Sequence, residues 1–532
     1  MRKLALTLQI AMLSSIASCG GGGSTSSPAP TAADVMEVSF ARIAQAGLDD
    51  IRVTAHLSQE GQPVLGAQPM YSSDRGSVSA LIERGAGNYE FVVTPTQTGE
   101  HQITVAFAGQ SIVRTALVFA DVAAGWGQPM AVEGLVNTPG YEDGITVTPD
   151  GQYLFVQYGP WRFSALYLYE APRSSGGAGG QRLLPSRFSH PWVDTTIGPT
   201  AAPERPGLFN GRFMNGQLLH NSNLWGVGLD QAPNFAPITM FYGFRRQADG
   251  SYAEPFYVAF DDANDGIMNP FGLSFRMNSA NQATILFALD DPSDPYNIDK
   301  NSDGSFDVDS RFDVFTYELT LGVNSLLGAY QVGSPPTPGN PYPSALVDFG
   351  RTGTTGNYGT QGNPHLHALS DGTVKAIFTD DEYDDSDADP DNDGDHGDLS
   401  AYVITSGSFP AGNWTKVVLP SKVNTSAQQI QPFFTGSELY FADDVSIRYS
   451  AFAGTDTVAD YGDDSKWSAS SVVLGKDTST IALGKVIAIG EPTIATIDGV
   501  EYLYFVYVWV RGFDATSGLP DLDMQAGFVP RN

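Results

Sequence analysis

Short apolar stretches separated by turn residues recur along most of the chain. They alternate with polar residues, or run for about five to eight positions between Gly, Asn, Asp and Pro, as in residues 50–57, 89–94 and 101–107. A period of two sends successive side chains to opposite faces of a strand, whereas sustained helical spacing would place them on one stripe. The chain lacks long stretches of helical spacing. The pattern therefore predicts an all-β protein of many short strands.

A longer pattern repeats within residues 121–532. A polar residue, in most copies followed by Pro, opens a strand, a turn follows, and an apolar strand returns. The openings align at Glu142, Asn269, Asn363, Gln431 and Glu491, and a sixth, fainter copy lies at 210–229. Repeats of this kind predict four-stranded sheets arranged around a channel. Residues 128–136 either add the outermost strand of the last sheet, which closes the ring, or form a linker.

One copy carries a recognisable motif. The sequence TPDGQYLF at 148–155 resembles the Ser-Pro-Asp-Gly signature of the TolB-type β-propeller repeat, with Thr in place of Ser. The Asp-Gly pairs at 371–372 and 498–499 keep only the turn, in which Gly supplies the positive φ. The resemblance implies a six-bladed β-propeller over residues 121–532.

The preceding segment, 35–120, contains alternating strands separated by turns. Its sequences GNYEFVVTP at 87–95 and GEHQITV at 99–105 resemble bacterial immunoglobulin-like domains of the invasin and filamin type. The resemblance implies a spacer or adhesive sandwich, with His101 on the surface of a strand. The expected fold is thus all-β, an N-terminal immunoglobulin-like sandwich followed by a six-bladed propeller.

The first residues predict where the protein resides. Arg2 and Lys3 precede an apolar run at 4–15 that is too short to span a bilayer, and the sequence IASC follows, ending at Cys19, which is the only cysteine. This arrangement resembles a bacterial lipobox. The resemblance implies a signal peptide at 1–18, a lipidated Cys19, and a flexible tether at 19–34. Because Gly20 follows the cysteine, it also implies the outer membrane, on its periplasmic side or at the cell surface.

Charge narrows the range of partners. The 59 acidic and 28 basic residues give a formal net charge of −31. Such a charge argues against nucleic acid and anionic lipid headgroups as partners, because both are polyanions. It suits an exported protein in a calcium-bearing medium.

Two acidic stretches have the spacing of calcium-binding loops. DPDNDG at 389–394 and DKNSDG at 299–304 place oxygen ligands at alternate positions before a Gly that permits a sharp turn. Both resemble EF-hand or dockerin loops without the Glu at the twelfth position, and both lie between the second and third strands of neighbouring repeats. The alternative is a solvated acidic insertion. The predicted ligands of structural calcium are Asp299, Asn301, Asp303, Asp307 and Asp309 in one loop, and Asp389, Asp391, Asp393, Asp395 and Asp398 in the other.

The residues that open the repeated strands are candidates for ligand binding, because equivalent positions form a ring at one mouth of a propeller. Their amides and carboxylates suit hydrogen bonding to a sugar or peptide, and Glu142 with Glu491 also suits general acid and base chemistry. The alternative is that these side chains cap strand ends or fasten neighbouring sheets. The ring comprises Glu142, Asn269, Asn363, Gln431 and Glu491.

A pair of histidines forms another candidate site. His365 and His367 alternate onto one face of a strand. With Asp380, Asp381 or Glu382 they suit a transition-metal or proton-transfer site, and the alternative is hydrogen bonding inside a polar channel.

These patterns favour a non-enzymatic lipoprotein of the outer membrane, whose calcium-stabilised propeller binds a protein or glycan of the cell envelope. The alternative is a polysaccharide-degrading enzyme, hydrolase or lyase, with its site at the channel mouth. One fold hosts both functions, so the geometry of the mouth decides between them. Convergence of Glu142, Glu491, His365 and His367 on a deep pocket favours catalysis, and a plugged channel favours binding.

Overall fold

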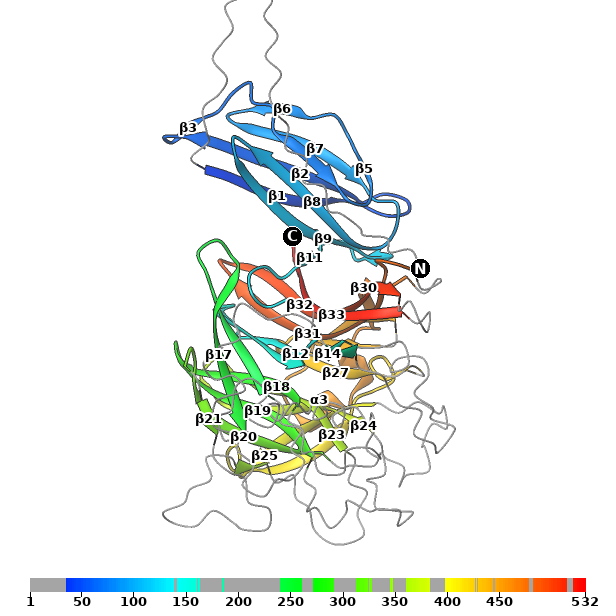
Figure 1. Cartoon of the computed structure of the whole chain (residues 1–532). Coiled ribbons are helices and arrows are strands. Elements are labelled where there is room, and N and C mark those ends of the chain that lie inside the picture. The colour runs from blue at the N-terminus through cyan, green and yellow to red at the C-terminus, as the bar shows by residue number, and fades with distance from the viewer. Residues whose placement is uncertain are drawn as a thin grey trace, which may run out of the picture.

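The computed structural model of the chain is nearly all β and built largely from antiparallel strand pairs (Figure 1). Within the described part, α3 (Val458–Tyr461) is the one α-helix, and no helix there is long and apolar enough to cross a membrane. The described residues are 35–137, 141–159, 161–162, 184–185, 240–260, 271–290, 312–323, 325–327, 345–347, 360–382, 398–425, 427, 429–443, 445–477, 482–513 and 520–532.

The N-terminal segment forms two sheets packed face to face. One contains β1 (Val35–Ile43), β2 (Asp50–Gln59), β7 (Asn88–Thr94) and β5 (Ser77–Val78), with β3 (Gln62–Pro63) and β6 (Ile82–Gly85) at its margins, and the other contains β4 (Met70–Ser73), β8 (Gly99–Phe107) and β9 (Gln110–Val118). Alternate residues of β2 and β7 are buried. The core between the sheets includes Val53, Phe91 and Val105. The alternation predicted at 50–57, 89–94 and 101–107 is confirmed.

Five four-stranded sheets follow. In chain order they are β12 (Tyr141–Val147), β13 (Tyr153–Gly159), β16 (Met240–Arg246) and β17 (Tyr252–Phe260); β18 (Phe271–Ser279), β19 (Gln282–Asp290), β20 (Phe312–Thr320) and β22 (Ala345–Leu346); β23 (Thr360–Ala368), β24 (Val374–Glu382), β25 (Asp398–Ser406) and β26 (Asn413–Val418); β27 (Ile430–Phe434), β28 (Glu438–Ala442), β29 (Ser446–Ala451) and β30 (Ser471–Gly475); and β31 (Val486–Ile497), β32 (Val500–Phe513), β33 (Pro520–Pro530) and β11 (Met130–Ala131). Smaller additions are β21 (Ser325–Leu327), which pairs with β17, and the pair β14 (Trp161–Arg162) and β15 (Leu184–Pro185).

The first strands of these sheets lie around a common centre. β12 contacts β18, β18 contacts β23, β23 contacts β27, β27 contacts β31, and β31 contacts β12 again. The described strands therefore close a ring of five sheets, not the six predicted. The supposed sixth copy at 210–229 lies outside the described residues, within a long connection between β13 and β16. Because those two strands pair directly as second and third strands, this connection is an insertion in the first sheet.

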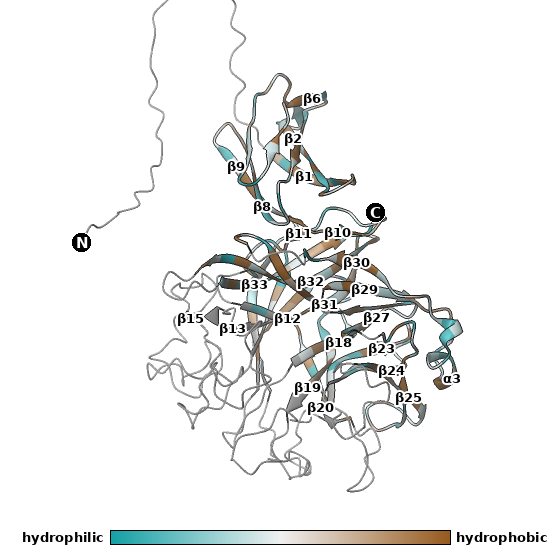
Figure 2. Ribbon diagram, turned by 90° about the vertical axis from the view of Figure 1, so that its right-hand side faces the viewer, coloured by the Kyte–Doolittle hydropathy of each residue, from teal (hydrophilic) through white to brown (hydrophobic). Residues whose placement is uncertain are grey.

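The N-terminal sandwich is joined to the rim of the ring (Figure 2). β11 pairs with both β9 and β33, and β10 (Asp121–Val122) pairs with β30. The prediction that residues 128–136 add the outermost strand of the last sheet is thus confirmed. Leu117 and Phe119 of the sandwich pack in a core with Phe505 and Tyr507 of the ring.

The placement of His101 corrects one expectation. His101 was expected on a strand surface, yet it is fully buried, with its Nε2 2.9 Å from the Gln97 carbonyl oxygen. Burial lowers the pKa of His101. The residue lies on the same face of β8 as Ile103 and Val105, which belong to the core between the two sheets of the sandwich.

Candidate functional site

The same backbone bulge interrupts the first strand of all five sheets. The register between first and second strands shifts after Asp143, Phe271, Gly362, Ile430 and Gly490. One residue of each bulge has a positive φ, between 39° and 64°: Gly144, Gly272, Asn363, Gln431 and Glu491. A bulge of this kind re-aims the side chains that follow it. The repeated opening seen in the sequence is therefore a repeated bulge.

This geometry corrects the alignment of two copies. Gly144, rather than Glu142, occupies the position equivalent to Gln431 and Glu491. In the second sheet the equivalent residue is Gly272, and the predicted Asn269 lies outside the described residues. A Cβ atom at Gly272 would stand 2.4 Å from the Cα of Asn363, so the close approach of the two strands requires glycine there.

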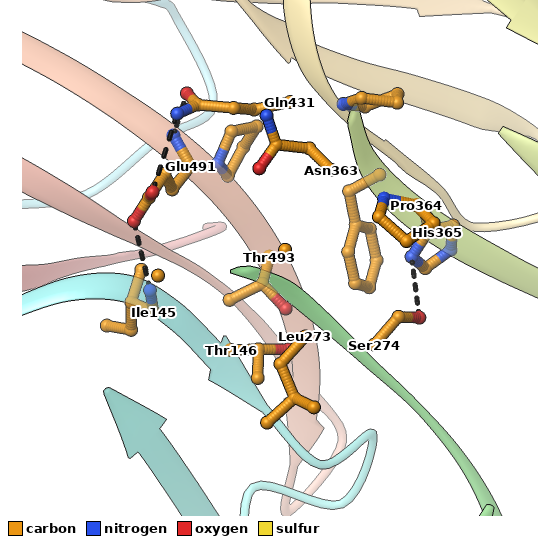
Figure 3. Close-up of a pocket in the computed structure, with 15 residues that line it drawn as sticks. Ile145, Thr146, Leu273, Ser274, Asn363, Pro364, His365, Gln431, Glu491 and Thr493 are labelled. Atoms are coloured by element: carbon orange, nitrogen blue, oxygen red, sulfur yellow. Dashed lines mark hydrogen bonds between the residues drawn. The ribbon is translucent and has the colours of Figure 1, made fainter. Parts of the chain in front are cut away.

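The five bulges surround a small cavity on the axis of the ring (Figure 3). It leaves about 40 Å³ for the centres of water-sized spheres and is partly open to solvent. Each sheet contributes three consecutive residues to the wall, namely 144–146, 272–274, 363–365, 431–433 and 491–493.

Side-chain hydrogen bonds at the bulges link the first sheet to the fifth, the fifth to the fourth, and the fourth to the third. The Ile145 N–H donates to Glu491 Oε2 at 3.0 Å, and the Glu491 N–H donates to Gln431 Oε1 at 2.8 Å. The Gln431 N–H in turn donates to Asp380 Oδ2 at 2.8 Å, and the Asn363 amide donates to the same oxygen at 2.7 Å. The alternative that the strand-opening residues fasten neighbouring sheets is confirmed for Gln431 and Glu491.

We expect Gln431→Leu to lower the free energy of unfolding by about 1 to 3 kcal/mol, because the Glu491 N–H loses its acceptor at a site with little access to water. Urea denaturation measures this difference. The matched control is Gln247→Leu, since the Gln247 amide donates to the Arg245 carbonyl on an exposed surface, and its effect should stay within about 0.5 kcal/mol. Equal losses in both variants would contradict a fastening role for Gln431.

The predicted acid and base do not form a pair in the cavity. Glu142 is fully buried and is not among the residues that line the cavity. It lies near Tyr507, whose pKa is raised first by burial and further by the charges of Glu100, Asp523 and Glu142. Glu491 does line the cavity, where its carboxylate accepts the hydrogen bonds described above.

The two histidines are buried and hydrogen-bonded. His365 Nε2 lies 2.9 Å from the Phe434 carbonyl oxygen, and Nδ1 lies 3.4 Å from Ser274 Oγ. Burial lowers the pKa of His365 to about 3, so its ring is neutral. His367 Nε2 instead lies 3.1 Å from Asp456 Oδ1. Asp380, the predicted partner of the histidines, thus accepts hydrogen bonds from Gln431 and Asn363 instead. The partner of His367 is Asp456, which the sequence pattern did not indicate.

The predicted calcium ligands lie outside the described residues, with the exception of Asp398 at the start of β25. The described strands nevertheless place the two acidic stretches at equivalent positions. One joins β19 to β20, the other joins β24 to β25, and these are the second and third strands of adjacent sheets. Across the described residues, no group of three or more His, Cys, Asp or Glu side chains is placed to hold a metal ion.

Sequence reasoning missed the hydroxyl groups of the cavity. Thr146, Ser274 and Thr493 stand two residues after the positive-φ residue of their bulges and line the wall. A signal was present only for Thr493, which is the third residue of the Glu-Pro-Thr opening at 491–493, because a bulge re-aims the side chains that follow it.

The chain matches no protein-family model and no curated protein. Among solved structures, a protein of unknown function from Dyadobacter fermentans is 9% identical, with a TM-score of 0.33, over 92% of this chain and 95% of that one. An α-L-arabinofuranosidase from Lactobacillus brevis is 10% identical with a TM-score of 0.32, over 54% of this chain and 86% of its own. An α-L-arabinanase from Cellvibrio cellulosa is 10% identical with a TM-score of 0.23, over 54% and 87% respectively. Likeness at these scores decides nothing about the chemistry of this chain.

Proposed function

We propose that this protein is a lipid-anchored lipoprotein of the outer membrane, in which an immunoglobulin-like domain carries a five-bladed β-propeller that binds a protein or glycan of the cell envelope. The ring of five four-stranded sheets supports the propeller assignment. The sandwich of two packed sheets, with its alternating burial, supports the immunoglobulin-like assignment.

One observation carries binding over glycan cleavage. The carboxylates proposed for acid and base chemistry do not meet in the cavity, because Glu491 lines its wall and accepts hydrogen bonds from neighbouring sheets, whereas Glu142 is buried outside the wall. The cavity is narrow, with about 40 Å³ for the centres of water-sized spheres, and its described wall lacks the pair of carboxyl groups between which a glycosidase seats a sugar ring. This favours a binding surface over a catalytic pocket.

Incubation of the purified 35–532 chain with peptidoglycan sacculi, lipopolysaccharide and capsular polysaccharide tests this function. We expect one of these polymers, or an envelope protein bound to it, to sediment with the protein. No new reducing ends or unsaturated sugar products should appear. Release of such products, abolished by Glu491→Gln, would instead establish the polysaccharide-degrading alternative.

The lipid anchor has its own test. Cys19 is the only cysteine, and two or three acyl chains hold a protein on a membrane far more firmly than one does. We expect wild-type protein in the outer-membrane fraction and Cys19→Ser in the soluble fraction after a high-salt wash. A Cys19→Ser protein that stays with the membrane would point to a protein partner as the tether.

Structural calcium remains part of the proposal, through the acidic stretches that contain Asp303 and Asp391. Lacking the twelfth-position Glu, these loops should bind with a Kd on the order of 0.1 to 1 mM. We expect the melting temperature to rise in millimolar calcium, and the rise to shrink when Asp389, Asp391 and Asp393 are replaced by Ala. Magnesium at the same concentration controls for ionic strength. A melting temperature that changes with neither calcium nor chelator would indicate that these stretches are solvated insertions.

A further inference from the structure

We propose that the free edge of β1 pairs in antiparallel register with β1 of a second copy of this chain, so that the protein self-associates through its N-terminal sandwich. This inference goes beyond the proposed function, because it depends neither on what the ring binds nor on how the chain is anchored.

In the described part of the chain, β1 is the long and regular free edge of the sandwich. Its nine residues pair with β2 in unbroken register, and β2 is the only described strand that pairs with it. The opposite margin of the same sheet consists of β5 and β6, of two and four residues, and the register of β6 shifts. In the second sheet β4 has four residues, and β9 is covered in part by β11. Margins that are short, irregular or covered resist edge-to-edge association, and β1 is the exception.

The inward side chains of β1 lack cover on their outer side. Met36, Val38 and Phe40 pack against the core of the sandwich but are only half-buried, whereas inward residues of β2, such as Val53, are fully buried. Among the described backbone groups, only those of β2 form hydrogen bonds with the backbone of residues 35–43. An edge of this kind is a template for another strand. A strand added beside β1 covers the apolar side chains and pairs the free N–H and C=O groups.

β1 also lacks the features that usually protect an edge strand. It contains no Pro, no Lys and no bulge, and the single charge within 35–41 is Glu37. Arg42 follows this stretch and turns toward the joint, where its guanidinium donates to three carbonyl oxygens of the segment 122–126 and to Asp49. The stretch available for pairing is therefore 35–41.

The sequence of this stretch is self-complementary about its centre. In a two-fold antiparallel pair centred on Val38, this residue faces Val38 of the second copy, and Met36 faces Phe40. On the other face of the sheet Glu37 lies opposite Ser39. Residues opposite each other share one face of such a pair, so the apolar stripe of one sandwich continues into the next and no like charges stand directly opposite. Two-fold pairing of this kind is the commonest form of self-assembly.

The chain's own N-terminal segment is a poor occupant of this edge. It leads directly into Val35, so it would have to reverse at once to lie beside β1. Its final part, STSSPAPTAA at 24–33, contains no aromatic residue, Val or Ile, and its Pro28 and Pro30 have no N–H to donate to a ladder. A second copy therefore fits the edge better than this segment does.

Disulfide cross-linking of the full chain tests the contact, in a Cys19→Ser background that removes the only native thiol. Small interfaces are weak, so the protein is studied at about 0.1 mM. Under a mild oxidant we expect Val38→Cys to form a covalent dimer at least about tenfold faster than Val113→Cys. Val113 is the matched control, because it is 54% exposed on β9 of the other sheet.

The register has a separate readout. Met36→Cys and Phe40→Cys should each fail to cross-link alone, since the two equal positions stand about 14 Å apart along the paired strands. The two variants should cross-link to each other when they are mixed. A Met36→Cys protein that links to itself would overturn the antiparallel register.

Sedimentation equilibrium of the Cys19→Ser chain should show monomers and dimers in exchange. Val38→Lys should weaken this association at least about tenfold, because it places two like charges opposite each other at the two-fold axis, and Val113→Lys should leave it unchanged. An unchanged melting temperature shows that Val38→Lys still folds, and the cysteine variants carry the test if it does not.

Equal cross-linking rates for Val38→Cys and Val113→Cys, or a purely monomeric chain at the same concentration, would overturn the proposal. So would cross-linking of Val38→Cys to a different protein in intact cells, which would identify a foreign strand as the occupant of the edge.

Discussion

A chain that begins at Thr138 is expected not to form the ring, whereas a chain that begins at Val35 should fold cooperatively. Residues before Thr138 complete the fifth sheet, since β11 pairs with β33, and extend the fourth sheet, since β10 pairs with β30. Trp126, Val132 and Val136 from the same segment are buried in the ring's hydrophobic clusters. Removing them exposes the edge of β33, and an open edge also invites aggregation.

A chain that begins at Ala120 separates the closing strands from the sandwich. It keeps β10 and β11 but loses Leu117 and Phe119, both buried against the ring. Loss of two buried side chains of this size costs about 3 to 6 kcal/mol. We therefore expect stability to fall in the order Val35, Ala120, Thr138, measured by melting temperature and by recovery of soluble protein. Equal melting temperatures for the Ala120 and Thr138 chains would show that residues 120–137 are a linker.

The strands could be predicted from the sequence because one face of each is buried. In β2 and β7 the apolar residues alternate with polar ones, and the burial alternates in the same phase. Register in such strands is fixed, since a slip of one residue would turn the apolar set outward. The returning second strands of the repeats, including β24 and β28, were visible for a related reason. They lie in the middle of their sheets and contain buried apolar runs, at 376–378 in β24 and 439–442 in β28.

The number of sheets could not be predicted from the sequence, because long insertions resemble repeats in a chain rich in short apolar runs. The stretch at 210–229 has the composition of a repeat, yet β13 pairs directly with β16 across it. Only the pairing separates an insertion within a sheet from an additional sheet. His101 was misplaced for a different reason: it shares the buried face of β8 with Ile103 and Val105, and its polar side chain was given more weight than this alternation.

Only part of the cavity could be predicted from the sequence. Pro after Asn363, Gln431 and Glu491 pointed to a shared position, but the left-handed backbone at these residues leaves no mark that propensity detects. The copy without Pro was therefore aligned at Glu142 instead of Gly144, and the second copy was aligned by its Asn269-Pro270 pair, two residues before the positive-φ position at Gly272. Strain of this kind at non-glycine residues costs on the order of 1 to 3 kcal/mol each, and the hydrogen bonds between sheets offset it.

Glu100, at the joint between sandwich and ring, should contribute a pH dependence to stability. Glu100 of β8 is 8% exposed, and its carboxylate accepts a hydrogen bond from Tyr507 OH at 2.7 Å. Burial raises the pKa of Glu100 from 4.5 to about 7; the Tyr507 hydrogen bond and the charges of Arg75 and Arg511 oppose this rise, whereas Asp74 adds to it. Docking therefore favours the protonated acid.

The sign follows from which state binds the proton. Below pH 4.5 Glu100 is protonated in both folded and unfolded chains, and its contribution to stability is fully present. Between pH 4.5 and about 7 the unfolded chain releases the proton while the folded chain retains it, so stability falls as pH rises. A difference of that size between the two pKa values corresponds to about 3 kcal/mol. Above about pH 7 the loss is complete.

We expect Glu100→Gln to remove this loss, because the amide oxygen still accepts from Tyr507 but carries no charge to desolvate. At pH 8 the variant should have a free energy of unfolding up to about 3 kcal/mol higher than that of the wild type, measured by urea denaturation. At pH 4.5 the two proteins should unfold at similar urea concentrations. Glu254→Gln is the control, since Glu254 is an exposed carboxylate of β17, and its pH profile should match the wild type. A Glu100→Gln protein with the wild-type slope between pH 4.5 and 8 would show that the joint tolerates the ionised carboxylate, with the Tyr507 hydrogen bond and nearby arginines compensating for burial.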